Sequence, residues 1–256
     1  MSPISVIIPC FNGAATIARA LQSCRSQREA TQILVVDDGS TDASASVVRT
    51  WAMQDERIRL LQTARIGGVA RARNWGVLHA NNPLVAFLDA NSEYLPDALA
   101  IAQAHLEQHP LEAAVRLDIE FAGFPAQIAT HPDFARHAAV LSNTVSSSLV
   151  MRRSVFLALG GFPMDDAFRR YGGEDGALSW VLSDLFAQRR LSDAKRVRVF
   201  HHPGIHAEQF LSVQMGFAQA DPVAAAETLL SSRAYLEMAR ATLRQLRAVS
   251  LNDSPA

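Results

Sequence analysis

The stretch Val35-Val36-Asp37-Asp38-Gly39-Ser40-Thr41-Asp42 decides the fold of this chain, because in it an apolar, β-branched run ends in two carboxylates and a glycine turn. Asp42 stands where the N-cap of a helix is expected. The aspartates either close a turn and cap that helix, or they place one carboxylate at a ligand crevice, where it would accept hydrogen bonds from a base or a ribose. In both cases a strand is followed by a helix.

Short β-branched runs alternate with longer helical stretches on both sides of this segment. Strands are expected at Ile4 to Ile8, Gln32 to Val36, Ile58 to Gln62 and Leu84 to Leu88, and helices at Ala14 to Ser26, Asp42 to Gln54, Gly68 to His79 and Pro96 to Leu106. This alternation predicts βαβ units on a mostly parallel sheet. Ligand-binding loops are then expected at the carboxyl ends of the strands.

The pattern loosens after Pro110. Strands are expected at 113–119, 147–151 and 195–200, with a short helix that stops at Gly160-Gly161 and a helix over 174–186, whereas 121–141 shows little periodicity. The tail from Asp221 to about Val249 is typical of a helix, with Asp221 as N-cap and Pro222 at its first position. Its apolar stripe is formed by Leu229, Leu236, Ala239, Leu243 and Leu246. The stripe either packs on its own domain, which we favour because a coiled coil needs more heptads, or forms the seam of a homodimer.

Composition excludes several classes of protein. The chain has 256 residues, of which 49% are apolar and 19% charged, so it can bury a sizeable core. With 24 basic and 25 acidic residues it has no excess of positive charge for nucleic acid. Cys10 and Cys24 cannot form a disulfide framework and are expected to fill the core. No basic leader and no apolar run of about 20 residues is present, so we expect a cytoplasmic protein, either free or peripheral at the inner face of the membrane.

Three further segments give the aspartate stretch a context. Ile7-Ile8-Pro9-Cys10-Phe11-Asn12 closes the first strand with an aromatic residue, Gly67 to Gly76 opens a helix with glycines and two arginines, and Phe87-Leu88-Asp89-Ala90-Asn91 ends the fourth strand. In this order and spacing the four segments resemble the nucleotide-sugar half of inverting family 2 glycosyltransferases, which have the GT-A fold. The resemblance is close over about residues 3 to 92 and reaches, more thinly, to about 205.

The resemblance implies an α/β, GT-A-like (Rossmann-like) domain: a mostly parallel twisted sheet flanked by helices, followed by a C-terminal helical tail. Residues 1–110 would form the nucleotide-sugar-binding half, 111–205 the acceptor-side half of the same domain, and 221–250 the C-terminal helix. The implied activity is transfer of a sugar, with inversion, from a nucleotide-diphosphate donor to a hydroxyl acceptor. A UDP-sugar is the expected donor, and a glycan or a lipid-linked hydroxyl is the expected acceptor.

The same resemblance assigns roles on the donor side. Pro9 and Phe11 would frame the base, and Asp38 would read its edge. Gly68 lies in the substrate-binding turn, and Arg73 would face the nucleotide, because Arg71 and Arg73 diverge by about 200° on a helix. Asp89 would meet the ribose, the diphosphate or a metal ion.

On the acceptor side, the resemblance covers 148–153, Gly160-Gly161-Phe162 and Gly172-Gly173-Glu174-Asp175. In the family, an acidic residue of the last pair removes the proton of the acceptor hydroxyl. Asp175 is the first choice for this general base, and Glu174 the second. His202, in His201-His202-Pro203-Gly204, resembles the downstream histidine that approaches the diphosphate and the metal.

The chain departs from the family at the metal-binding turn. Asn91 stands where a second aspartate is usual, so the expected Mn or Mg ion would be held by Asp89, Asn91 and His202, with affinity reduced by the uncharged amide. Glu93 would restore the charge if the chain stays extended after the strand. Alternatively, Arg71, Arg73 and His202 neutralise the diphosphate without a metal.

Three other positions differ from the family: Ile66, Ala177 and Val181. Together with Asn91 they keep a second function open, that of a non-catalytic relative that binds nucleotide sugars and has lost metal-dependent transfer.

Overall fold

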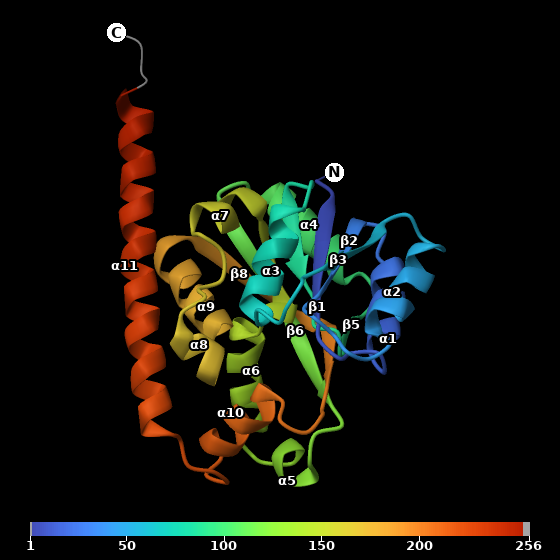
Figure 1. Ribbon diagram of the computed structural model, residues 1–256. Coiled ribbons are helices and arrows are strands. Elements are labelled where there is room, and N and C mark those ends of the chain that lie inside the picture. Colours follow the sequence, from blue (N-terminus) through green and yellow to red (C-terminus); the bar gives the residue numbers. More distant parts are fainter. Residues whose placement is uncertain (1, 253–256) are drawn as a thin grey trace.

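The computed structural model describes residues 2–252, with side chains as far as residue 246, and it is built on one eight-stranded sheet in the order β3-β2-β1-β4-β7-β6-β8-β5 (Figure 1). The strands are β1 (Ile4–Cys10), β2 (Ala30–Asp37), β3 (Ile58–Gln62), β4 (Leu84–Phe87), β5 (Ser92–Tyr94), β6 (Glu112–Ala122), β7 (Leu149–Arg152) and β8 (Ala187–Phe200). Strands β3, β2, β1 and β4 pair in parallel, as do β6 and β8, whereas β7 and β5 are antiparallel to their neighbours. The expected mostly parallel α/β sheet is confirmed, and the antiparallel β5 and β7 make it a mixed sheet.

Helices cover both faces of this sheet. They are α1 (Ile17–Arg25), α2 (Ser44–Ala52), α3 (Val69–Leu78), α4 (Ala98–Gln108), α5 (Ala126–Ala129), α6 (Phe134–Thr144), α7 (Arg153–Ala158), α8 (Asp166–Tyr171), α9 (Glu174–Leu185), α10 (His206–Gln214) and α11 (Pro222–Asn252). One face packs against α1, α2 and α4, and the other against α3, α7 and α9, with α11 on the outer side of α8 and α9. A smaller cluster joins α5, α6 and α10.

The alternation along the central strands produces this two-sided core. In β1, Ile4, Val6 and Ile8 face α1 and α4, whereas Ile7 faces α3. All four side chains are fully buried, and each contributes on the order of 2 kcal/mol of burial. Strands that are buried on both faces have nearly continuous apolar sequences. For this reason β1, β2 and β4 can be predicted from the sequence.

The strand order indicates where a ligand crevice is expected. From β1 the chain first builds outward through β2 and β3 and then returns to place β4 on the other side of β1. Such a reversal leaves an open crevice at the carboxyl ends of the two central strands. The loops that begin at Phe11 and Leu88 both emerge there.

The second half of the chain differs most from the sequence-based expectation. The stretch 121–141, which shows little periodicity, contains α5 and α6, and the last strand begins at Ala187 instead of Lys195. Strand β5 and helices α8 and α10 were not expected. The chain also does not stay extended after β4, because the Ser92 N–H donates to the Asp89 carbonyl at 2.9 Å and closes a turn. The alternation argument for Glu93 is therefore wrong.

Helix α11 runs along α8 and α9, and its far end projects beyond the body of the molecule (Figure 1). Asp221 caps it, accepting from the backbone N–H groups of Val223 and Ala224 at 2.9 and 3.2 Å. Leu236 and Ala239 of the expected stripe are buried against the chain's own domain, Leu243 is half-buried, and Leu229 and Leu246 are exposed. Packing on its own domain is thus confirmed for the middle of the helix, and the dimer seam stays a prediction.

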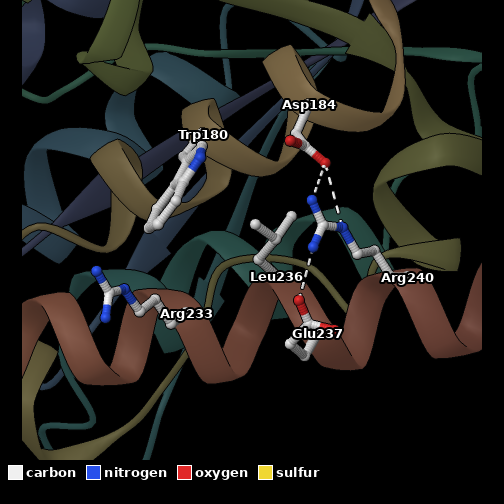
Figure 2. Close-up of a pocket in the computed structure, with 6 residues that line it drawn as sticks. All are labelled: Trp180, Asp184, Arg233, Leu236, Glu237 and Arg240. Atoms are coloured by element: carbon white, nitrogen blue, oxygen red, sulfur yellow. Dashed lines mark hydrogen bonds and ion pairs between the residues drawn. The ribbon is translucent and has the colours of Figure 1, made fainter.

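A groove with a volume of about 360 Å³ separates α11 from α9 (Figure 2). Trp180 and Asp184 line it from α9, and Arg233, Leu236, Glu237 and Arg240 line it from α11. Arg240 closes one end by pairing with Asp184 at 2.8 Å. Within residues 2–252, no helix combines the length and the apolar composition that crossing a membrane requires.

The packing of α3 on the sheet can be tested at Gly76, where the helix contacts β1 and β2. A Cβ added at Gly76 would lie 2.4 Å from Ile7 Cγ2 and 3.2 Å from Val36 Cγ2. We expect Gly76→Ala to lower the free energy of unfolding by roughly 1–3 kcal/mol, through overpacking. The helical Gly176 has no atom within 4 Å of an added Cβ, so Gly176→Ala should instead raise stability by about 0.5–1 kcal/mol. Urea unfolding of both variants measures the difference, and equal effects would contradict this packing.

Candidate active site

The loops after β1 and β2 are joined by hydrogen bonds that shape one wall of the crevice. The Asn12 N–H donates to Ser40 Oγ at 2.9 Å, and the Thr41 N–H donates back to Asn12 Oδ1 at 2.9 Å. Asn12 has a φ of 49°, a left-handed conformation that asparagine tolerates better than most residues. The neighbouring Phe11 is left half exposed at the crevice, with 51% of its surface accessible, and Pro9 is buried in β1.

The two aspartates after β2 have different partners. Asp37 closes its own turn, accepting from the Ser40 N–H at 3.0 Å, and it also accepts from Gln62 Nε2 at 3.1 Å. Asp38 accepts from the backbone N–H groups of Gly67 and Gly68 at 2.7–3.0 Å and from Thr63 Oγ1 at 3.0 Å. The buried Asp38 therefore positions the glycine turn that opens α3, and its predicted contact with a base edge is untested.

Gly68 makes this turn possible. Its φ of 92° is unfavourable for a residue with a Cβ, and it directly precedes the first residue of α3. Because its N–H points at Asp38, the carboxylate lies at the N-terminus of α3, where the helix dipole favours negative charge.

The centre of the site is the guanidinium of Arg73. Its Nη2 donates to Asp89 Oδ1 at 2.9 Å and its Nη1 to Glu174 Oε1 at 2.8 Å. Arg73 and Glu174 are buried, at 4% and 7% exposure, and Asp89 is half-buried. Burial by itself would lower the pKa of Arg73, but Asp89, Glu174 and Asp175 raise it. Arg73 thus joins the end of β4 to the start of α9.

Asp175 lies beside this ion-pair network without belonging to it. Its Oδ1 accepts from the Gly176 N–H at 2.9 Å. Desolvation is the main cause that raises its pKa, to about 6. The negative charge of Glu174 adds to the increase, and the charge of Arg73 opposes it. A carboxylate with this pKa is ionised at neutral pH and is a better proton acceptor than an ordinary aspartate.

A second buried guanidinium supports the helix that carries Asp175. Arg116, on β6, donates to the Val145 carbonyl at 3.0 Å and to the hydroxyls of Ser148 and Ser179. The Ser179 hydroxyl in turn donates to the Asp175 carbonyl at 2.7 Å. Burial lowers the pKa of Arg116 to about 10, and the negative charge of Asp175 opposes that decrease.

Sequence reasoning missed two residues at this site, Ser147 and Arg116. Ser147 Oγ donates to Asp89 Oδ2 at 2.8 Å and accepts from the Asp89 N–H at 3.1 Å. It precedes β7, which is antiparallel to β4, so it lies beside the carboxyl end of β4. In the sequence, Ser147 is marked by a run of serines over 146–148. Arg116 is marked as a charged residue inside the apolar pattern of β6.

The residues expected to hold a metal are at the same end of the sheet but do not form a prepared cation site. Both oxygens of Asp89 are engaged, one of them by a guanidinium, and the Asn91 amide carries no charge. Glu93 pairs with Arg198 at 2.6 Å. His202 is exposed, two residues beyond β8, with its Nδ1 at 3.2 Å from the Pro203 carbonyl oxygen. One neutralised carboxylate does not match the charged oxygen ligands that Mn²⁺ or Mg²⁺ prefers.

Arg71 occupies a different environment from Arg73. It is exposed, and its side chain lies over Gly67, where an added Cβ would be 2.4 Å from Arg71 Cδ. The helix therefore separates the two arginines as expected, with Arg73 toward Asp89 and Arg71 toward solvent.

This chain is similar to known proteins in both sequence and fold. A family model described as glycosyl transferase family 2 matches residues 5–138, just over half of the chain. Succinoglycan biosynthesis protein ExoU of Rhizobium meliloti (strain 1021) is 38% identical over 96 residues, which are 38% of this chain and 28% of that protein. The match therefore spans less than a third of this relative.

Solved structures with similar folds include two sugar-nucleotide complexes. S. aureus TarS 1-349 in complex with UDP-GlcNAc superposes with a TM-score of 0.63 at 18% identity, covering 86% of this chain and 68% of that one. The mannosyltransferase PcManGT from Pyrobaculum calidifontis, in complex with GDP-Man and Mn²⁺, superposes with a TM-score of 0.66 at 22% identity, covering 100% and 76%. At these identities the likeness establishes the fold, which is GT-A-like.

The Arg73 network predicts a large asymmetry between the two arginines of α3. We expect Arg73→Met to lower the free energy of unfolding by about 3 kcal/mol, because two carboxylates lose their shared cation. Arg71→Met, on the same helix, should change it by less than about 0.5 kcal/mol. Urea unfolding at neutral pH measures both, and similar values for the two variants would show that the buried charge does not hold the site together.

Proposed function

The chain belongs to glycosyl transferase family 2, and we propose that it transfers a sugar, with inversion, from a UDP-sugar to a hydroxyl acceptor. The observation that carries this proposal is the buried Arg73, which holds Asp89 and Glu174 at 2.9 and 2.8 Å and so places Asp175 at the same carboxyl edge as Phe11 and Asp38. UDP is the nucleotide chosen because a structure with this fold holds UDP-GlcNAc. A GDP-sugar is the comparison donor, because another holds GDP-Man.

Inverting transfer is one in-line displacement. The acceptor oxygen forms a bond to the anomeric carbon while the bond from that carbon to the diphosphate oxygen breaks, and the electron pair leaves with UDP. Asp175 takes the proton of the acceptor hydroxyl as this happens. Its raised pKa suits this step, because the carboxylate is ionised at neutral pH and still basic.

Glu174 is the weaker choice for the base. Its side chain is buried and its Oε1 already accepts from Arg73. The ion pair makes this carboxylate a weaker proton acceptor. Arg73 acts in this scheme as a positioning residue, because it holds the ends of the donor-side and acceptor-side segments in one arrangement.

On the donor side, the proposal keeps the expected roles of Pro9, Phe11, Asp38 and Gly68, whereas Arg73 positions two carboxylates instead of facing the nucleotide. Phe11 offers an exposed ring for stacking on uracil, beside Pro9, and Asp38 with Gly68 forms the turn next to it. The acceptor is proposed to be a glycan or a lipid-linked hydroxyl, and the site of action to be the cytoplasm or the inner face of the membrane.

For the metal, we propose that the free protein has low affinity for Mn²⁺ or Mg²⁺. Asp89, Asn91 and His202 are the groups nearest to where such an ion is expected, and they bring one carboxylate that Arg73 has already neutralised. The reaction scheme above therefore assigns the proton transfer to Asp175, a side chain of this chain.

The general base is tested by Asp175→Asn. We expect this variant to bind UDP as the wild type does and to release UDP from UDP-sugars about 10² times more slowly or worse. Because the base must be ionised, the wild-type rate should rise with pH through about 6 and then level off. Calorimetric UDP titration and coupled UDP-release assays give both readouts, and an unchanged rate or pH profile would move the base elsewhere.

The same experiment separates the two functions. A wild-type protein that binds UDP without metal but releases none from UDP- or GDP-sugars would be the non-catalytic relative. That alternative is favoured by the saturated Asp89 carboxylate and the uncharged Asn91.

The metal is tested by Asn91→Asp. A second carboxylate in the turn supplies the missing charge for a hard cation, so we expect the Mn²⁺ concentration that gives half-maximal UDP binding to fall by roughly tenfold. Asn82→Asp, at a half-exposed turn before β4, is the control for a general charge effect. If Asn91→Asp leaves that concentration unchanged, no ion is bound at this turn.

A further inference from the structure

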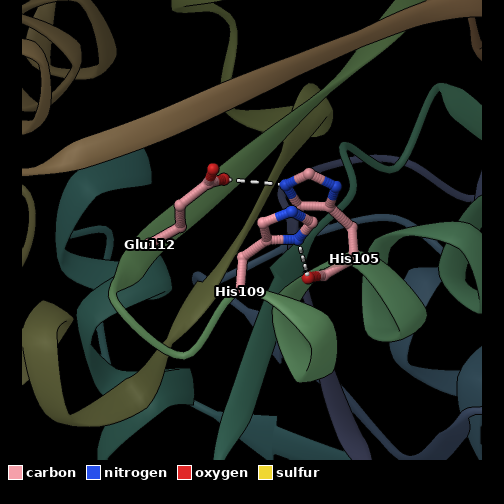
Figure 3. Close-up of side chains that lie close together, drawn as sticks. All are labelled: His105, His109 and Glu112. Atoms are coloured by element: carbon pink, nitrogen blue, oxygen red, sulfur yellow. Dashed lines mark hydrogen bonds and ion pairs between the residues drawn. The ribbon is translucent and has the colours of Figure 1, made fainter.

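His105, His109 and Glu112 form a compact cluster where α4 passes into β6 (Figure 3). Their ligand atoms all lie within 4.8 Å of one another. The two histidines are four residues apart on the end of the helix, so they share one face, and their rings stack with centroids 4.2 Å apart. Glu112 Oε2 lies 2.7 Å from His105 Nε2.

The cluster is remote from the Arg73 network. Strand β6 is parallel to β4, because both are antiparallel to β7. Glu112, the first residue of β6, therefore lies at the amino end of the sheet, opposite the edge that carries Asp89 and Asp175. Nothing in the proposed transfer reaction uses these three side chains.

The hydrogen bonds prepare His109 as a ligand. Its Nδ1 lies 2.9 Å from the His105 carbonyl oxygen, and since a carbonyl only accepts, Nδ1 carries the proton. In the neutral ring the lone pair is then on Nε2. Metal-binding histidines have the same arrangement, in which a carbonyl fixes the tautomer and the ring orientation.

The backbone of the cluster is held in place independently of the three side chains. Arg152 Nε donates to the Glu112 carbonyl at 2.9 Å, and its Nη2 donates to the carbonyls of Leu106 and His109 at 2.8 and 3.2 Å. One guanidinium thus fastens the last turn of α4 to the first residue of β6, so the ligands come from a rigid support. Its positive charge is directed at these carbonyl oxygens.

We propose that His105, His109 and Glu112 bind one Zn²⁺ ion, with water completing the coordination. Two imidazole nitrogens and one carboxylate form a familiar Zn²⁺ ligand set, and with bonds of about 2.0–2.2 Å, neighbouring ligands of a tetrahedral ion are roughly 3.3 Å apart. Small side-chain rotations bring atoms that lie within 4.8 Å to that spacing. The ion would take the place of the hydrogen bond between His105 Nε2 and Glu112 Oε2, and His105 would bind it as the neutral imidazole, with its proton on Nδ1.

A bound ion would act as a cross-link within the fold. An ion at this place joins α4 to β6, which is the connection between the donor-side and acceptor-side halves of the sheet. Because Zn²⁺ binds the folded arrangement, its presence should raise the melting temperature of the whole domain.

The test uses the full chain after removal of metals with a chelator. We expect calorimetry and competition with a chromophoric chelator to give one Zn²⁺ per chain and an increase in melting temperature. His109→Ala and Glu112→Gln should each weaken binding by at least roughly tenfold, since losing a supporting hydrogen bond alone costs that much at metal sites.

His79→Ala is the matched control, because His79 also ends a helix with its Nδ1 at 2.9 Å from the carbonyl of the residue four positions earlier, but has no second histidine there. His79→Ala should bind Zn²⁺ as the wild type does. The proposal is overturned if the wild type binds no Zn²⁺ at micromolar concentrations, or if His109→Ala, verified as folded by circular dichroism, binds as tightly as the wild type.

Discussion

One buried cation, the guanidinium of Arg73, determines how the two parts of this protein meet. It lies between Asp89, at the end of β4, and Glu174, at the start of α9, which are far apart in the chain and belong to different segments of the fold. A charge this deeply buried is stable only if its partners are held in place. The packing of α3 on β1 and β2, through Gly76, brings Arg73 there, and the antiparallel β7 brings Ser147 to the other oxygen of Asp89.

The same arrangement distributes the negative charge unevenly among three carboxylates. Asp89 and Glu174 share Arg73, while Asp175 receives only a backbone hydrogen bond in the same poorly solvated region. Its pKa is raised, so keeping Asp175 ionised at neutral pH lowers the free energy of unfolding. Carboxylates with a raised pKa in poorly solvated surroundings are often found at functional sites.

The two ends of the sheet are organised differently. At the carboxyl end, polar loops are joined by hydrogen bonds from Asn12, Asp38 and Ser147, and carboxylates surround an arginine. At the amino end, Arg152 fastens the connection between α4 and β6, with two histidines and a glutamate above it. The proposed transfer reaction uses the carboxyl end of the sheet, and the proposed Zn²⁺ site uses the amino end.

The sequence by itself determined the strands and helices of the first 92 residues, because β1, β2 and β4 are buried on both faces and must be written as apolar runs. It also placed Phe11, Asp38 and Asp89 at one edge, since parallel strands end together, and it identified the family. Only the tertiary structure decided the rest. The turn at Asp89 ends the extended run that would have placed Glu93 beside Asp89 and Asn91, and Arg73 binds two carboxylates. Ser147 and Arg116 also became visible only in the structure, because their partners are 58 and 63 residues away. Contacts over such separations depend on how packed elements meet, which leaves no local pattern to read.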